Sequence, residues 1–154
     1  MKIIGIDPGL QKTGWGIITK DGNALKYIAS GLIKTNAKAE LAQRLATLHH
    51  GLTDIINTHA PQTAAVEETF INKNPASALK LGQARGVVLA VPAILNLPTA
   101  EYSANKIKKS VVGTGHASKD QIQMMIRTLL PASGQITEDE ADALAVAITH
   151  AHHT

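Results

Sequence analysis

The sequence contains no cysteine, which excludes disulfides, thiolate zinc sites, iron–sulfur clusters and cysteine nucleophiles. Aromatic residues are scarce, with 1 Trp, 2 Tyr and 1 Phe, so a core must be built from Ala, Leu, Ile and Val. The longest apolar run, residues 86–97, is too short to span a bilayer and is interrupted by Pro92. A composition with 44% hydrophobic and 18% charged residues excludes a disordered chain and predicts one domain over residues 1–154.

The N-terminus reaches Asp7 and Pro8 too early for a secretory signal. Together with the lack of cysteine, this predicts a cytoplasmic protein with no membrane partner.

Charge is unevenly distributed along the chain. Residues 69–119 hold seven Lys and Arg against one acid, whereas residues 120–154 hold one Arg against five acids. A basic middle segment suits a polyanion, because Lys and Arg neutralise phosphates. An ordinary solvated face remains the alternative on charge alone.

Turn residues and hydrophobic periodicity predict an α/β domain with a mixed sheet. The expected strands cover residues 2–7, 13–19, 24–34, 63–67 and 97–102. The expected helices cover residues 38–59, 74–91, 103–109 and 118–130, and a last helix begins after Thr137.

Carboxylates stand at the ends of several of these elements. Asp7 ends the first strand, and Glu67 and Glu68 end a later one on opposite faces, so spacing leaves open which of the two joins a site. Asp139 and Asp142 share one face of the last helix. Each acid alone could be an ordinary loop or helix-end residue. Parallel neighbouring strands would bring the strand-end acids to one edge of the sheet.

Several carboxylates in one pocket repel each other, and divalent cations resolve that repulsion. Mg²⁺ prefers oxygen ligands, and two such ions about 3.5–4 Å apart can activate water and stabilise a leaving oxygen. An acidic site beside a basic segment therefore indicates phosphodiester hydrolysis.

Five short motifs follow one another along the chain: IGIDPG (4–9), TGWG (13–16), VEETF (66–70), ALKLGQARG (78–86) and ADALA (141–145). Together they resemble the RuvC family of bacterial Holliday-junction resolvases, and the similarity covers residues 2–150. The first motif alone also occurs in actin-like ATPases, whereas the whole set in order is specific. The resemblance implies an RNase H-like fold, with a five-stranded mixed sheet flanked by helices. It also implies a homodimer that resolves four-way DNA junctions by paired nicks in recombination and repair.

The same resemblance implies the residues of the site. It assigns catalysis and metal binding to Asp7, Glu67, Asp139 and Asp142, and so selects Glu67 over Glu68. It further implies two Mg²⁺ ions per active site, replaceable by Mn²⁺, and the RuvA–RuvB branch-migration complex as a partner.

Groups around these acids are candidates for DNA binding. The resemblance implies functional lysines at Lys108 and Lys119, either to position a phosphate or to stabilise charge in the transition state. Exposed lysines beside a loop are the alternative. Phe70 follows the Glu67 strand and is predicted to stack on an unpaired base, although it could also be a core residue.

Small residues recur every four positions at Ala78, Gly82 and Gly86. They permit close approach to the domain's own sheet or to a partner helix, and the resemblance favours the interface of a two-fold dimer.

Three histidines, His150, His152 and His153, lie near the C-terminus. They are interpreted as a frayed helix end rather than a metal site.

Two other functions compete with this reading. One is an actin-like nucleotide phosphotransferase, although such proteins enclose ATP between two domains and this chain has room for one. The other is a junction-binding protein without catalysis, which the presence of all four acids argues against.

Overall fold

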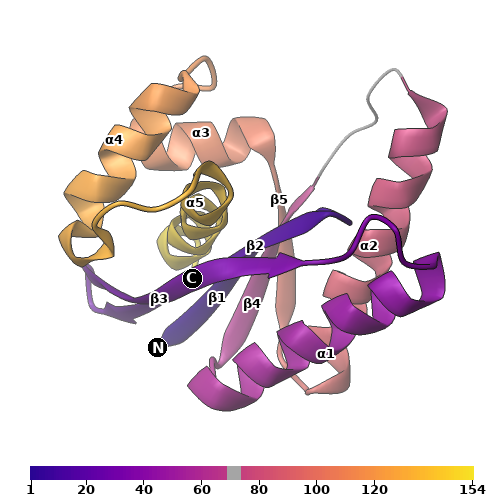
Figure 1. Cartoon of the computed structure of the whole chain (residues 1–154). Coiled ribbons are helices and arrows are strands. Elements are labelled where there is room, and N and C mark those ends of the chain that lie inside the picture. Colours follow the sequence, from indigo (N-terminus) through magenta and orange to yellow (C-terminus); the bar gives the residue numbers. More distant parts are fainter. Residues whose placement is uncertain (69–73) are drawn as a thin grey trace.

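The structure is a computed structural model, and it describes residues 1–68 and 74–154. A five-stranded mixed sheet runs through its centre in the order β3-β2-β1-β4-β5 (Figure 1). The strands are β1 (Lys2–Asp7), β2 (Lys12–Asp21), β3 (Ala24–Lys34), β4 (Thr63–Glu68) and β5 (Thr99–Ser103). The pairs β1–β2 and β2–β3 are antiparallel, whereas β1–β4 and β4–β5 are parallel. The predicted meander and the predicted mixed sheet are both confirmed.

Helices cover both faces of the sheet (Figure 1). They are α1 (Leu41–His59), α2 (Pro75–Ile94), α3 (Ala104–Val112), α4 (Lys119–Leu129) and α5 (Glu138–His152), with a 3-10 turn at Pro131–Ser133. The core beside α3, α4 and α5 includes Ile3 and Ala65, and the core beside α1 and α2 includes Ile4 and Val66. Successive residues of one strand therefore serve opposite cores, as strand geometry requires.

Helix boundaries follow capping chemistry closely. The side chains of Asn74, Ser103, Ser118 and Thr137 each accept a backbone N–H at the start of a helix. Each of these helix starts was predicted from such a residue, because a side-chain oxygen satisfies a donor that the helix leaves free. The predicted end of the second helix at residue 91 is wrong, since α2 continues through Pro92 to Ile94.

Three glycines let α5 lie directly on the sheet. A Cβ at Gly5 would overlap the backbone of Ala143, and one at Gly14 would overlap the carbonyl oxygen of Asp139. A Cβ at Gly16 would meet the side chain of Leu144. The helix that carries Asp139 and Asp142 is therefore as close to β1 and β2 as backbone contact allows.

The prediction of a frayed C-terminal helix end is wrong. His150 is 6% exposed and hydrogen bonds with Thr63 Oγ1 (2.9 Å) and the Tyr102 hydroxyl (2.7 Å). Burial lowers the pKa of His150, so its ring is neutral near pH 7. His152 contacts Ser110 Oγ through Nδ1 at 2.9 Å. The helix end stays ordered because it packs against β5 and α3.

Among the helices that these described ranges contain, none combines the length and the hydropathy needed to cross a membrane.

Candidate active site

Strand register places Asp7 and Glu67 next to each other. In the parallel pair β1–β4, Ile6 lies level with Val66, so Asp7, the last residue of β1, lies beside Glu67, the next-to-last residue of β4. A hydrogen bond joins their side chains. Glu67 follows the alternation of Ala65 and faces α5, whereas Glu68 lies on the opposite face. The structure therefore supports Glu67, the acid that the family resemblance selected and that spacing alone left open.

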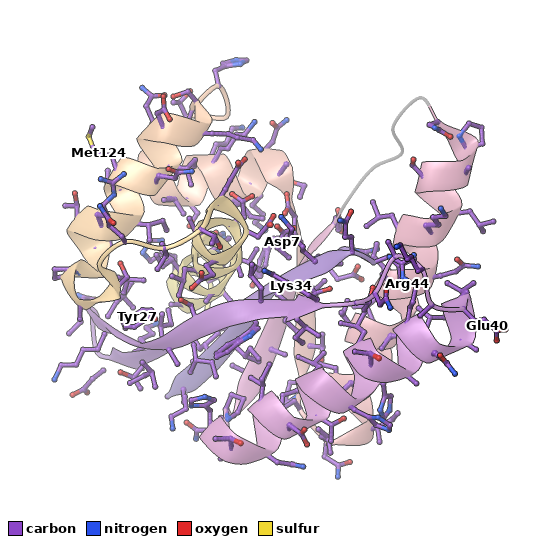
Figure 2. The ribbon with its side chains drawn as sticks, in the orientation of Figure 1. Asp7, Tyr27, Lys34, Glu40, Arg44 and Met124 are labelled. Atoms are coloured by element: carbon purple, nitrogen blue, oxygen red, sulfur yellow. The ribbon has the colours of Figure 1, made fainter. Side chains whose placement is uncertain are left out.

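The first two turns of α5 bring two more carboxylates to this point. Single carboxylate oxygens of Asp7, Asp139 and Asp142 all lie within 4.8 Å of one another. Figure 2 shows Asp7 near the centre of the molecule, where the strand ends approach α5. Gly14, opposite Asp7 on β2, provides the space for this approach. The four predicted acids thus form one cluster although they are up to 135 positions apart in sequence.

The cluster holds more negative charge than its surroundings neutralise. Burial, followed by the charges of Glu67 and Asp142, raises the pKa of Asp7 to about 9. Burial, followed by the charge of Glu67, raises the pKa of Asp142 to about 6. Burial also raises the pKa of Glu67, although Lys108, Lys119 and Arg85 oppose that shift. With its pKa at about 9, the Asp7 carboxyl holds a proton near neutral pH unless a cation replaces it.

The donor set suits a hard divalent cation. The neighbouring carboxylates supply only oxygen atoms, which Mg²⁺ and Mn²⁺ accept and which a softer metal such as zinc would share with nitrogen or sulfur. Three of the acids are close enough to contact one ion together. The residues present therefore fit the predicted metal.

Lysines form one wall of the cleft that opens onto the acids. The cleft has a volume of about 240 Å³, and Glu67, Asp142, Lys108 and Lys119 are among its lining residues. Lys119 also forms an ion pair with Glu138, the first residue of α5. Cations and acids thus face the same space, as a site for a phosphodiester requires.

The sequence matches a known protein family. The sequence model of the family described as crossover junction endodeoxyribonuclease RuvC matches residues 3–150. The chain belongs to the RuvC family. A RuvC relative from Paramagnetospirillum magneticum is 59% identical over 153 residues, which cover 99% of this chain and 92% of that protein. One from Rhodopseudomonas palustris is 56% identical, over 99% of this chain and 88% of that protein.

Solved RuvC structures have the same fold. A structure of T. thermophilus RuvC in complex with Holliday junction substrate matches with a TM-score of 0.93 at 30% identity, covering 99% of this chain and 94% of that one. A second Thermus thermophilus RuvC structure matches with a TM-score of 0.89 at 29% identity, covering 99% and 95%. The predicted RuvC resemblance and RNase H-like fold are confirmed. The actin-like alternative is not supported.

Two further sequence predictions concern Phe70 and the small residues of α2. Phe70 lies outside the described residues. The glycines of the small-residue face on α2, Gly82 and Gly86, are exposed, and a Cβ on either would meet nothing within 4 Å. Packing of these glycines against the domain's own sheet is therefore excluded, and the partner helix remains as the prediction.

Sequence reasoning missed the groups that hold the acids in place. Arg85 donates a hydrogen bond to the carbonyl oxygen of Glu67 (2.6 Å) and pairs with Glu101, which fixes the end of β4. Glu140, beside its bond from the helix cap Thr137, accepts a hydrogen bond from Ser30, which ties the start of α5 to β3. Arg85 stands in one of the family motifs, but no spacing rule links it to Glu67. Only the packing of α2 beside β4 does so.

Proposed function

We propose that this chain is a metal-dependent endonuclease that resolves four-way DNA junctions in recombination and repair. The observation that carries the proposal is the half-buried cluster of Asp7, Glu67, Asp139 and Asp142 beside two lysines, Lys108 and Lys119. Relatives named crossover junction endodeoxyribonuclease RuvC, and a RuvC solved with a Holliday junction, support the same substrate.

The four acids are the catalytic and metal-binding residues of this proposal. Asp7 lies at the centre of the cluster, within reach of Asp139 and Asp142 and hydrogen bonded to Glu67. Asp7 would be a ligand in the two-Mg²⁺ site that the family resemblance implies, with Mn²⁺ as a substitute that accepts the same ligands. When bound, such ions supply the Lewis acidity that favours attack of water on phosphorus and stabilises the leaving 3′ oxygen.

The remaining groups bind and position the DNA. Lys108 and Lys119 line the cleft from the side facing Glu67 and Asp142, so both can hold a phosphate against the acids. Lys119 must exchange its pairing with Glu138 for a phosphate oxygen, and both lysines can then stabilise charge that develops during the reaction. Phe70 is proposed to stack on an unpaired base near the cut.

The proposal includes a homodimer in which residues 1–154 act as one nuclease domain. The face of α2 that carries half-buried Ala78 and exposed Gly82 and Gly86 is proposed to pack on the same face of a second copy. A two-fold dimer presents two acid sites to two symmetry-related strands, which accounts for paired nicks. The RuvA–RuvB branch-migration complex is the proposed partner that presents the junction.

A nicking assay on a synthetic four-way junction tests this function. With Mg²⁺ or Mn²⁺ we expect symmetric nicks whose ends a ligase can rejoin, and with EDTA we expect none. A linear duplex of the same sequence is the control and should stay intact. Binding without cutting would identify a non-catalytic junction-binding protein, and equal cutting of the duplex would contradict junction selectivity.

A further inference from the structure

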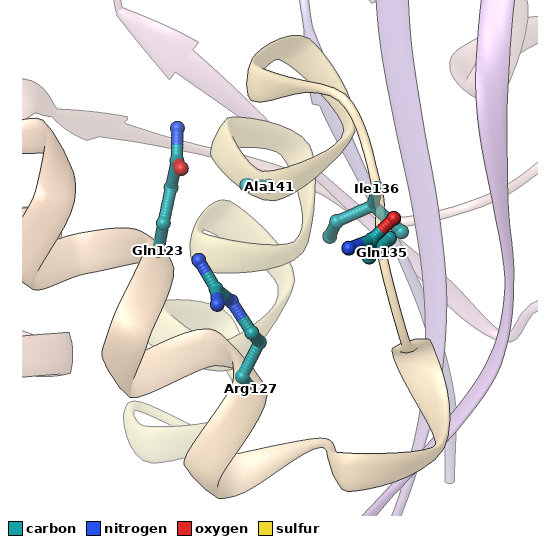
Figure 3. A pocket seen from close by; sticks show the side chains of 5 residues that line it. All are labelled: Gln123, Arg127, Gln135, Ile136 and Ala141. Carbon is teal, nitrogen blue, oxygen red and sulfur yellow. The ribbon is translucent and has the colours of Figure 1, made fainter.

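A second polar hollow lies on the same helix that carries Lys119. It has a volume of about 270 Å³ and is lined by Gln123 and Arg127 of α4, Gln135 and Ile136 of the connection to α5, and Ala141. Figure 3 shows the Arg127 side chain extending along α4 toward Gln123, with Gln135 facing it from the connecting segment. The hollow is therefore lined by a guanidinium and two amides, and by no acid.

Arg127 stands out in its surroundings. It is the only Lys or Arg in residues 120–154, a segment that also holds five acids, and its side chain is exposed. Within the part of the chain that the structure describes, it forms no ion pair with any of those acids. A guanidinium presents several donors in a fixed plane that matches two phosphate oxygens, and neighbouring amides can add further donors. The chemistry of the hollow is that of a phosphate site.

Helix α4 contributes side chains both to the hollow and to the cleft at the candidate active site. Lys119, Gln123 and Arg127 are spaced four residues apart, so they form a row on the helix surface. The first member lines the acidic cleft and the other two line the hollow. At about 1.5 Å per residue the row is about 12 Å long. One DNA strand advances about 3.4 Å per nucleotide along its axis, so the row spans three to four nucleotides.

We propose that Arg127, with Gln123 and Gln135, binds a backbone phosphate of the junction three to four nucleotides from the phosphate held at Lys119. This inference rests on the proposed function, because it takes the junction as the ligand. Arg127 lies outside the acid cluster and does not touch the reacting phosphate. It therefore contributes to binding and to the position of the DNA arm, but not to the chemical step.

The test is junction affinity as a function of salt, measured in EDTA so that no cutting occurs. Arg127→Ala should weaken binding about three- to tenfold and reduce the magnitude of the salt slope by about 0.9, the value for one lost phosphate contact. Arg127→Lys should keep most of the slope, since it keeps the charge. Lys38→Ala, which removes an exposed charge before α1, is the matched control and should change neither quantity. Single-turnover nicking at saturating protein with Mg²⁺ should be unchanged in Lys38→Ala.

Two further measurements keep the outcome decisive. Gln135→Glu places an acid in the hollow at an exposed position, so it should weaken binding even if Arg127→Ala folds poorly. If Arg127→Ala lowers the unfolding temperature but leaves affinity and salt slope at parental values, Arg127 only supports the fold and the inference is wrong. If the parent chain itself fails to bind the junction, the proposed function fails together with this inference. If the parent binds and cuts the junction, and the Arg127 and Gln135 variants bind it with parental affinity, only this inference is wrong and the proposed function stands.

Discussion

Replacing Asp7 with asparagine should stabilise the metal-free protein and abolish nicking at the same time. Burial and the neighbouring acids raise the pKa of Asp7 from 3.8 to about 9. Because the folded pKa lies above the unfolded one, folding takes up a proton at intermediate pH. The stability associated with this group is complete below about pH 4 and is lost as the pH rises through about 9. Asparagine has a similar shape and can donate a hydrogen bond to Glu67. Because it cannot ionise, it avoids the free-energy cost of a carboxyl among other acids.

The size of the effect follows from the same pKa values. A pH of 7 lies about 3.2 units above the unfolded pKa of 3.8. Each unit adds about 1.4 kcal/mol to the free energy needed to keep the Asp7 carboxyl protonated in the folded protein. The free energy of unfolding can therefore rise by at most about 4 kcal/mol in Asp7→Asn. Because the pocket relaxes around a charged Asp7, the expected increase is about 2–4 kcal/mol. For a chain of this length, that gain raises the unfolding temperature by about 5–10 °C.

Thermal unfolding in EDTA at pH 5 and pH 7.5, repeated with Mg²⁺, measures this effect. Asp7→Asn should exceed the parent in stability at pH 7.5, and the difference should shrink at pH 5. Mg²⁺ should stabilise the parent and have little effect on the variant, since the variant has lost the central ligand. The variant should still bind a four-way junction without cutting it. Equal stability of the two proteins at pH 7.5 in EDTA would refute the electrostatic argument, and nicking at the parental rate would refute the site assignment.

Three other substitutions test the surroundings of the site. Gly14→Ala adds a Cβ that overlaps the carbonyl oxygen of Asp139, so it should displace the start of α5, cost about 1–3 kcal/mol of stability and reduce nicking at least tenfold. Lys108→Ala should weaken junction binding and flatten its salt dependence by about 0.9 in slope, as measured by titration at several salt concentrations. Gly82→Leu introduces a bulky side chain on an exposed position of α2 and should convert a dimer into a folded monomer in sedimentation experiments.

For each of these substitutions, one result would contradict the prediction. Gly86→Ala, where a Cβ meets nothing within 4 Å, is the control for Gly14→Ala and should keep the fold. Parental nicking by Gly14→Ala would show that α5 has room to move. Junction affinity that does not change with salt would argue against the role of Lys108. A dimer that persists in Gly82→Leu would place the interface elsewhere.

Local chemistry made the elements of this fold predictable. Alternation in β1 separates Ile4 and Ile6 from Gly5 and Asp7, and these residues do face opposite cores. Helix starts were predicted from caps such as Ser118 and Thr137, because capping depends only on residues three or four positions apart. The end of α2 was less predictable. Pro92 sits in its last turn, where the residues that follow can still complete the helix.

Local spacing does not predict the role of a side chain when that role depends on partners far away in the sequence. His150 looked like part of a frayed end, yet Thr63 and Tyr102 from two strands bury it and hydrogen bond with it. Arg85 became relevant only when α2 packed beside the end of β4. Neither contact has a signature in local spacing, because the partners are 18 to 87 residues away.

The sequence by itself determined where the strands and helices lie, which faces are apolar and which acids end the elements, because these properties depend on neighbouring residues. The family resemblance then selected Glu67 over Glu68. The tertiary structure decided that Glu67 shares a face with Asp7, that three glycines admit α5, and that Asp139 and Asp142 therefore reach the strand ends. It also set the unusual pKa of Asp7. That property arises from burial and from charges that only the folded chain brings within a few ångströms.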